Sequence, residues 1–435
     1  MEIRSRKFCF LALGVLLLAL ALPIQAKTIK VWLTGHSNEQ LRIISDLTES
    51  QFTAKTGIAV EFTSLSWADN ENRFLLAAAS GDVPDVAGAG ALFLPELGLR
   101  GALIDLTQMA GFDEVRSRAN PSFYRSLSYK SLVFGVPYFS NVTTAYQRDD
   151  ILQNLGLGEM ITWDELIKAL PKMQANGTNF MLQWGLGDGI YADLNMFMWQ
   201  KGADDYNEDL TRSGYDSPEA IEAFKDYVDL YVKHKIAVEL PPVQAFMSED
   251  LAITLQYPSF YTNLIHSAPT IEGKWSMVQA PGYASSEKLN RTTFGTGSSL
   301  GIFERSKNKA EAWEFVKWFT DDSTQVELAK RTMDEIPGSI FIPANPEGAL
   351  KIGIEQKAAE IFTKALAEST ASVYGLVAPR HRRRYLQMAG QKAIFQGADP
   401  EEAMKEAARE HNVEIERKQK EYERFITRLL AEQKN

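Results

Sequence analysis

The spacing of apolar residues in the first third of the chain predicts regular elements in a repeating order. Residues 28–33 and 58–63 are expected to be strands, and residues 39–55 and 70–79 are expected to be helices. A third strand begins at Asp85, after the turn at Gly81. The order strand, helix, strand, helix, strand is typical of a lobe built on a parallel sheet.

Ligand sites in a lobe of this kind lie beyond the carboxyl ends of the strands. Three loops follow the predicted strands, at residues 35–38, 64–69 and 88–93. These loops are therefore candidate site segments before any other argument is made.

The middle of the chain repeats the pattern. Val142, Thr144 and Tyr146 are typical of a strand, and Thr162 with Glu165 forms a capping box that predicts a helix start. Further strands are expected within 180–184, 246–255 and 275–279, and further helices within 194–201 and 217–235. Since the chain without its first segment has about 410 residues, two domains are expected.

The last part of the chain is predicted to be helical. Residues 309–319 place Ala312, Trp313 and Phe319 on one face. Asp399 and Pro400 are suited to the start of another helix, and residues 401–432 are rich in Ala, Glu, Lys and Arg. This tail is expected to form one or two surface helices of the second lobe.

The first 26 residues have the pattern of a secretory signal peptide. A basic start is followed by an apolar run of about 15 residues, shorter than the roughly 20 that a spanning helix needs. Cys9, the only cysteine, lies within this run and not at its end. The sequence therefore predicts a periplasmic protein without a lipid anchor.

Composition and charge exclude several classes of function. The net charge of −10 argues against binding to nucleic acid or to anionic membranes. The five histidines are scattered without metal-ligand spacing, so neither a metal site nor a cofactor is expected. Gly297-Ser-Ser-Leu-Gly301 matches the pattern of a nucleophilic serine at Ser299, but no partners for a triad are visible.

Aromatic residues in the loops after predicted strands indicate carbohydrate binding. Rings can stack on the C–H faces of sugars while nearby polar groups contact the hydroxyls. Core packing is the alternative for each ring. The six candidates are Trp67, Trp184, Tyr191, Tyr257, Phe260 and Tyr261.

Five segments in a fixed order resemble the family-1 extracellular solute-binding proteins, which are the maltose-binding-like receptors of ABC importers. The segments are Phe134–Leu152, Gly81–Val86, Ile161–Leu166, Phe294–Ile302 and Ser306–Phe319. The resemblance implies two α/β lobes, each a mostly parallel sheet with flanking helices, joined by a hinge. It also implies a monomer that carries a sugar to membrane permease subunits.

The resemblance divides the chain into lobe one, residues 27–139 and 291–343, and lobe two, residues 140–290 and 344–435. Crossings between lobes are expected near Ser140, Pro281 and Pro343. The small, apolar residues 87–93 replace the Trp and the charged pair of maltose-binding members, so a saccharide other than maltodextrin is expected. The full set of expected ligand-binding residues is His36, Ser37, Asn38, Trp67, Asp69, Ser140, Asn141, Trp184, Asp188, Tyr191, Tyr257, Phe260, Tyr261, Gly297, Ser298 and Arg380.

Two alternatives remain open. A secreted carbohydrate-active hydrolase would need a pair of carboxylates, which many acidic residues could supply. A receptor for a phosphorylated polyol, such as glycerol phosphate, could use the basic run Arg380–Arg384. The same run could equally be a solvated helix face.

We predict that the mature protein begins near Lys27 and carries no lipid, because Cys9 lies ahead of any cleavage site. Intact-mass spectrometry of the protein purified from its native cells should give the mass of the unmodified chain from this residue. Detection of an acylated cysteine would contradict the prediction.

Overall fold

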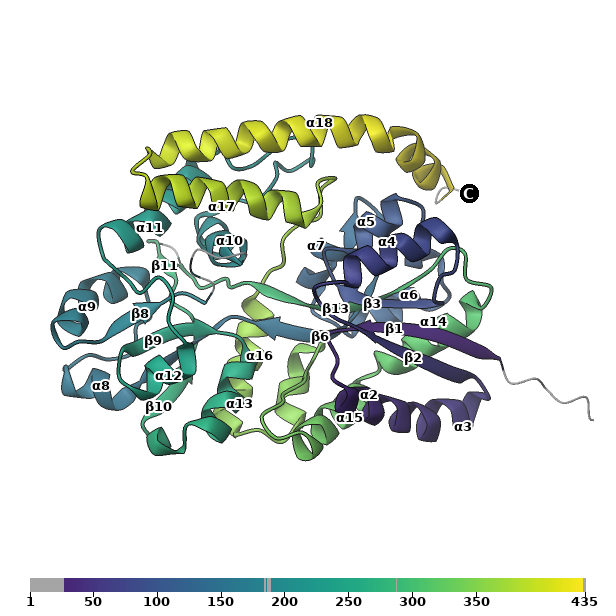
Figure 1. The fold of residues 1–435 in the computed structure, drawn as a ribbon, viewed down its shortest axis with the longest axis horizontal. Helices are drawn as coiled ribbons and strands as arrows, with labels where there is room; N and C mark the ends of the chain where they lie inside the picture. The colour runs from purple at the N-terminus through teal and green to yellow at the C-terminus, as the bar shows by residue number, and fades with distance from the viewer. Residues whose placement is uncertain (1–26, 184, 186–188, 287, 433–435) are drawn as a thin grey trace, which may run out of the picture.

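The computed structural model describes residues 27–183, 185, 189–286 and 288–432. The predicted signal peptide lies outside these residues, as do Trp184 and Asp188 of the predicted site. The chain forms two lobes joined in the middle of the molecule (Figure 1). Within the described residues, no helix is both long enough and apolar enough to span a bilayer.

The first lobe is built on a six-stranded sheet. Its first strand in the sequence, β1 (Thr28–Thr34), buries Ile29, Val31 and Leu33 at alternate positions, because successive side chains of a strand point to opposite faces of the sheet. The pairing is parallel only between β1 and its neighbours β2 and β3. In order across the sheet, the strands are β14 (Ile342–Pro343), β6 (Val136–Val142), β13 (Gly295–Ile302), β3 (Val86–Gly90), β1 (Thr28–Thr34) and β2 (Ala59–Leu65).

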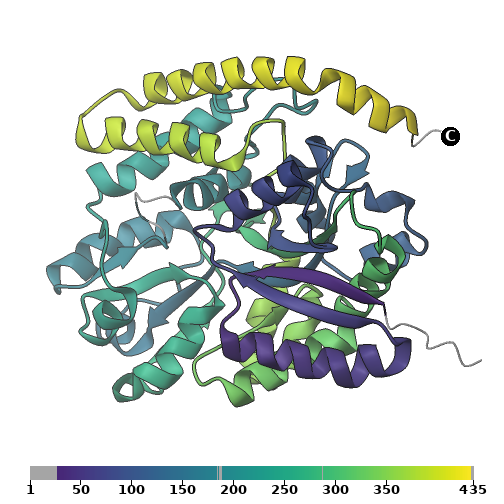
Figure 2. The ribbon, with the colours of Figure 1, turned by 45° about the vertical axis from the view of Figure 1, so that its right-hand side comes forward.

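Helices cover both faces of this sheet (Figures 1 and 2). The predicted helix 39–55 is continuous in space, with a π-helical turn in its middle. The predicted helix at 309–319 has the same bounds in the structure. The helical segments of this lobe are α2 (Asn38–Leu47), η1 (Thr48–Thr53), α3 (Ala54–Thr56), α4 (Asn70–Ser80), α5 (Leu94–Leu99), η2 (Leu106–Gln108), α6 (Phe112–Ser117), η3 (Pro121–Phe123), α7 (Tyr124–Leu127), α14 (Lys309–Phe319), α15 (Asp322–Glu335) and η5 (Pro346–Lys351), and a small hairpin joins β4 (Ser128–Tyr129) to β5 (Leu132–Val133).

The second lobe is built on a four-stranded sheet in which only β8 and β9 are parallel. Both sheets are therefore mixed, because the strands that cross between the lobes pair antiparallel with their neighbours. The strands, in order, are β10 (Trp275–Val278), β7 (Thr144–Arg148), β9 (Leu251–Gln256) and β8 (Asn179–Met181), and a separate hairpin pairs β11 (Tyr283–Ala284) with β12 (Leu289–Asn290).

The helices of the second lobe start where the sequence predicts in two clear cases. The capping box of Thr162 and Glu165 is formed at the start of α9, and Asp399 accepts a hydrogen bond from the Glu402 N–H at the start of α18. The helical segments are α8 (Asp149–Asn154), α9 (Trp163–Ala175), α10 (Ile190–Lys201), α11 (Pro218–Val232), α12 (Pro242–Met247), α13 (Pro258–Ser267), η4 (Pro269–Ile271), α17 (Pro379–Phe395) and α18 (Pro400–Glu432), while α16 (Gln356–Glu368) contacts β6 and β10 at the junction of the lobes.

Three chain crossings lie side by side between the lobes. Thr143, which separates β6 from β7, donates its N–H to the carbonyl of Phe294 over 3.1 Å. The Thr370 N–H in turn donates to the carbonyl of Thr293 over 3.0 Å. The lobes are thus joined by a narrow, hydrogen-bonded ribbon of backbone.

The expected crossing near Pro343 is wrong. Pro343 lies in the edge strand β14 of the first sheet, a position where its missing N–H is tolerated. The following η5 packs on β14 and α15, so the chain stays with lobe one before it crosses at Thr370. The expected boundary of lobe two at residue 344 is therefore too early.

The tail was expected to lie on lobe two alone, and this expectation needs correction. α18 packs along α17 and α11 of lobe two and then reaches α5 of lobe one. Figures 1 and 2 show it as one helix that runs over both lobes.

A buried polar cluster attaches α17 to lobe two. Arg382, 4% exposed, donates to Asp205 Oδ2 over 2.8 Å, and Asn195 and Tyr215 donate to the same carboxylate. Asp205 itself is 1% exposed. The basic run that contains Arg382 is therefore not a single solvated face, since one of its members lies in the core.

We predict that Asp205→Ala lowers the free energy of unfolding by about 3–5 kcal/mol, because it leaves the buried Arg382 cation without its anion. Urea unfolding followed by circular dichroism measures the change. Asp216→Ala is the control, since Asp216 pairs with Arg212 on the surface and should cost less than about 1 kcal/mol. Equal losses in the two variants would contradict the prediction.

Candidate functional site

An exposed tryptophan lies over the carboxyl ends of the parallel strands in lobe one. The Trp67 side chain is 57% exposed and follows β2. A Cβ atom at Gly35 would lie 2.1 Å from the Trp67 Nε1, and one at Gly90 would lie 3.5 Å from its ring. Gly35 also has a φ of +81°. The glycine at position 35 therefore lets the indole approach the backbone closely while more than half of Trp67 stays exposed.

His36 is held beside the crossing strand β6. Its Nε2 lies 3.0 Å from the Tyr138 hydroxyl, and the two rings are stacked with centroids 6.1 Å apart. Burial lowers the pKa of His36 to about 4. The imidazole is therefore neutral at neutral pH and can serve as a hydrogen-bonding group but not as a cation.

Polar residues surround Trp67 and His36 at the start of two helices. Ser37 caps α2 and forms a capping box with Gln40. Asp69 precedes α4 and accepts a hydrogen bond from the Ser66 hydroxyl over 3.0 Å. Ser37, Asn38 and Asp69 are all exposed, so they remain accessible although Ser37 and Asp69 also serve the local structure.

The predicted residues of the crossing strands differ in their accessibility. Ser140 is fully buried and donates its hydroxyl to the Pro343 carbonyl over 2.7 Å, so its expected ligand contact is replaced by a structural one. Gly297 lies opposite Ser140, where a Cβ would lie 1.7 Å from the carbonyl oxygen of Phe139. Ser298 is 3% exposed, and Asn141 is half-buried.

Lobe two presents an aromatic cluster next to these strands. Tyr191 and Tyr257 pack around Phe294, and the Tyr191 ring meets the Phe294 ring edge to face at 5.6 Å. The guanidinium of Arg383 lies 5.7 Å above the Tyr191 ring. Nearby, Gln183 accepts a hydrogen bond from the Thr143 hydroxyl over 3.1 Å.

Two predicted aromatic residues lie in the core instead. Phe260 is 4% exposed and packs against Tyr146 and Phe246, while Tyr261 is 5% exposed and packs against Trp275. The segment after β9 is the first turn of α13 with Pro258 at its start, not a loop, and the helix turns both rings inward. The prediction of stacking rings at Phe260 and Tyr261 is corrected accordingly.

Arg380 joins the two lobes directly. From α17, its Nη1 and Nη2 lie 2.9 and 3.1 Å from the two oxygens of Glu96 on α5, and Nη1 lies 3.4 Å from Glu71 on α4. Hydrogen bonding to Glu96 raises the pKa of Arg380, and burial raises the pKa of Glu71. Arg380 therefore binds carboxylates of the protein itself, whereas the sequence predicts that it contacts the ligand.

The contacts of Arg380 bring the start of α4 next to the start of α17. Glu71 is in the first turn of α4, shortly after Trp67 in the chain, and Arg383 lies about one helical turn after Arg380 on α17. The ion pair between Glu71 and Arg380 therefore brings the carboxyl edge of the first sheet opposite the start of α17. We call the surfaces around Trp67 and around Tyr191 with Arg383 the interlobe site.

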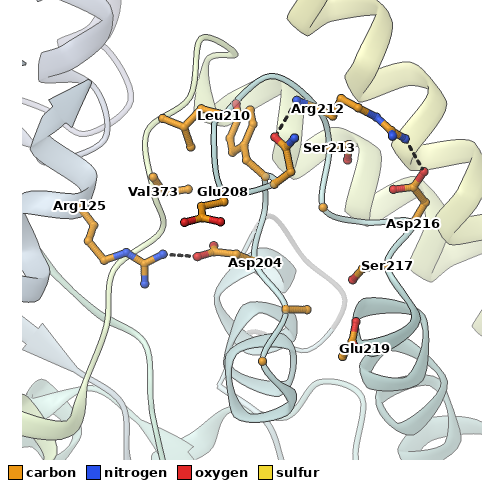
Figure 3. A pocket seen from close by; sticks show the side chains of 15 residues that line it. Arg125, Asp204, Glu208, Leu210, Arg212, Ser213, Asp216, Ser217, Glu219 and Val373 are labelled. Carbon is orange, nitrogen blue, oxygen red and sulfur yellow. Dashed lines mark hydrogen bonds and ion pairs between the residues drawn. The ribbon is translucent and has the colours of Figure 1, made fainter. Parts of the chain in front are cut away.

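A second ion pair between lobes lies nearer the crossings. Arg125 of α7 pairs with Asp204, and it also donates to the Thr370 hydroxyl over 2.8 Å. Figure 3 shows this pair at one side of a pocket of about 530 Å³ in which Arg212 pairs with Asp216. Both arginines of the pocket are therefore paired with carboxylates, Glu208 and Glu219 add further acidic side chains to its lining, and Tyr206 in the same lining is 4% exposed.

The sequence analysis missed Arg383, Glu71 and Glu96. For Arg383 a signal existed, since Arg382, Leu386, Ala389 and Ala393 follow the buried period of a helix and leave Arg380 and Arg383 on another face. No comparable signal marks Glu71 or Glu96, because each acquires its role from a residue about 300 positions away.

Two other kinds of site, a nucleophilic serine and a metal site, were considered among the described residues. Ser299 of the nucleophile-like pattern is 1% exposed in the middle of β13. No group of three or more His, Cys, Asp and Glu side chains in the described part of the chain could hold a metal ion.

The sequence matches the model of the family "Bacterial extracellular solute-binding protein" over residues 37–326. A putative binding protein of Brucella abortus is 24% identical over 363 residues, covering 80% of this chain and 84% of the relative. A lactose-binding protein of Rhizobium radiobacter is 26% identical over 308 residues, covering 67% and 70% of the two chains.

Solved structures share the fold. The sugar-binding protein MalE of Xanthomonas citri has a TM-score of 0.78 at 17% identity, and the match covers 91% of this chain and 99% of that one. A solute-binding protein of Thermotoga lettingae bound to α-D-tagatose has a TM-score of 0.70 at 21% identity, covering 89% and 100%. At these identities the likeness establishes the two-lobe architecture.

We predict that His36 remains neutral until the pH falls close to 4. Since its folded pKa is below the unfolded value of about 6.5, the unfolded chain binds the extra proton and stability falls as the pH drops from about 6.5 toward 4. NMR titration of the His36 ring signals measures the pKa. In His36→Gln the slope of unfolding free energy against pH should be smaller in that window, and an ordinary pKa for His36 would contradict the prediction.

Proposed function

Because the chain belongs to the family of bacterial extracellular solute-binding proteins, we propose that its solute is a saccharide that binds between the lobes. The protein delivers this saccharide to the membrane permease of an ABC importer. Relatives whose descriptions name lactose, maltose or tagatose support a sugar ligand.

The observation that carries the proposal is the exposed indole of Trp67 on its glycine support. A large, rigid ring that is exposed at the carboxyl edge of a sheet offers apolar surface for stacking on a sugar and loses little conformational freedom when it binds. Across the interlobe site, Arg383 supplies N–H donors for sugar hydroxyls, and its position above Tyr191 holds the guanidinium in place.

Further contacts are assigned from accessibility. Asp69 and Asn38 can accept or donate to hydroxyls at the rim of lobe one, and Asn141 can do so from the crossing strand. Tyr191 and Tyr257 form the aromatic part of lobe two. The remaining members of the proposed site are His36, Ser37, Gly297 and Ser298 on lobe one, together with Trp184 and Asp188, which are proposed from the sequence alone.

The geometry favours a saccharide over a phosphorylated polyol. Of the basic run Arg380–Arg384, Arg380 and Arg382 are already bound to carboxylates, so an anionic ligand between the lobes would be left with Arg383, whose guanidinium lies over the Tyr191 ring. The segment 87–93 carries no charged side chain, which argues for a solute other than a maltodextrin.

We further propose that the protein acts as a binding protein without catalysis, as a periplasmic monomer released from its signal peptide. Solute binding then shifts the population toward the closed arrangement of the lobes. Incubation with oligosaccharides should generate no new reducing ends, and their appearance would favour the hydrolase.

The test of the sugar proposal is a thermal-shift screen of mono- and oligosaccharides that includes lactose, maltose, tagatose and glycerol 3-phosphate. At least one neutral sugar should raise the melting temperature, because a ligand that binds only the folded state stabilises it. A shift with glycerol 3-phosphate alone would replace the saccharide by a phosphorylated polyol.

We predict that Trp67→Ala weakens binding of the sugar found in the screen by about ten- to a hundredfold, since a stacked ring contributes about 1–3 kcal/mol. Isothermal titration calorimetry measures the affinity. Trp67→Phe should retain most of it, and Leu76→Ala, at a 67% exposed apolar position on α4, is the matched control. Unchanged binding in Trp67→Ala would remove Trp67 from the site.

A further inference from the structure

The long C-terminal helix α18 is anchored in lobe two by its first half. Met404 and Ala408 are buried in the core of that lobe, at 0% and 1% exposure. Asn412 accepts a hydrogen bond from the Ser213 N–H over 2.8 Å, and His411 Nδ1 lies 3.0 Å from the Ser213 hydroxyl. This half therefore moves with lobe two.

The last turns of the same helix pack on lobe one. Tyr422 and Ile426 are 5% and 8% exposed, and Leu429 and Leu430 are partly buried beside them. The Phe425 ring lies against Gly101, where a Cβ atom would be 3.1 Å from it. This apolar strip, Tyr422 to Leu430, holds the end of α18 on lobe one as Met404 and Ala408 hold its first half on lobe two.

The ion pair of Arg380 lies beneath this contact. Glu96 is 2% exposed and accepts hydrogen bonds from Arg380 on lobe two and from Arg100 on its own helix. Arg100 is also one residue from the Gly101 that the helix end covers. The apolar strip and the ion pair therefore join the same two bodies at the same place.

Both contacts must break together when the lobes separate. A 33-residue α-helix is about 50 Å long and bends sharply only at a kink, so the end of α18 leaves lobe one when its first half follows lobe two through a large opening. Breaking the contact exposes the strip to water and leaves Glu96 without its partner from the other lobe.

We propose that the end of α18 and the Arg380–Glu96 ion pair form a latch that holds the two lobes together in the absence of solute. Arg380 is in this sense a positioning residue, which sets the separation of the lobes and does not touch the sugar. The proposal rests on the hinge between the lobes and not on the identity of the solute.

The experiment measures the separation of the lobes without any sugar. The chain after the signal peptide has no cysteine, so Asn72→Cys on α4 and Lys168→Cys on α9 introduce two unique sites for spin labels. Both positions are exposed and lie on different lobes. Double electron–electron resonance then reports the distribution of distances between the lobes in the full mature protein.

The parent should show one narrow, short distance. Arg380→Gln and Ile426→Glu should each raise about tenfold the fraction of molecules in which the two spin labels are farther apart. This is the effect expected for the loss of a charge-assisted hydrogen bond or of a buried side chain. Arg384→Gln on α17 and Val413→Glu on α18 are the controls, because both side chains are exposed away from the latch and should leave the distribution unchanged.

A parent whose lobes are already widely separated without sugar would overturn the proposal, even if a variant failed to fold. Identical distributions in the parent, Arg380→Gln and Ile426→Glu would also overturn it. The outcome is independent of the sugar screen: failure to bind any sugar would refute the saccharide proposal and leave the distance distribution to decide the latch.

Discussion

The constraint on which the structure depends is the three-stranded ribbon of backbone between the lobes. Thr143, Thr293 and Thr370 are far apart in the sequence, yet their backbone groups are joined by hydrogen bonds. A ribbon this narrow restrains translation of the lobes more than rotation about it. The surfaces that face each other across it, around Trp67 and around Tyr191, are therefore placed by the ribbon while the distance between them remains adjustable.

Electrostatic pairing decides which parts of those surfaces are available to a solute. Within a run of five basic or histidine residues, Arg382 is buried against Asp205, Arg380 crosses to Glu96, and Arg383 rests on Tyr191. A buried cation without an anion is costly, so Arg382 keeps its carboxylate, and Arg380 is occupied by Glu96 while the lobes are together. Arg383 can exchange water for sugar hydroxyls at a smaller cost, which is why the proposed contact falls to it.

Local patterns in the sequence predicted the elements well where the signal is itself local. The capping box at Thr162 and the helix 309–319 are examples, because adjacent residues determine them. The positions of residues relative to distant segments of the chain were harder to predict. The sequence predicts a loop at Phe260, whereas Phe260 lies in the first turn of α13, which begins at Pro258, and packs in the core. The tail carried apolar residues for both lobes, but only the tertiary structure shows that Tyr422 and Ile426 lie on lobe one.

The balance between the latch and the solute follows from linkage. Interactions that hold the lobes together without solute reduce the free energy that the solute must supply for closure, and so they strengthen its apparent affinity. The same interactions lower the fraction of protein that is open for entry and slow association. A solute-binding protein gains from tight capture only if it can still release its solute. The latch must therefore remain weak enough for a membrane partner to open, which suits a contact made by a helix end and one half-exposed arginine.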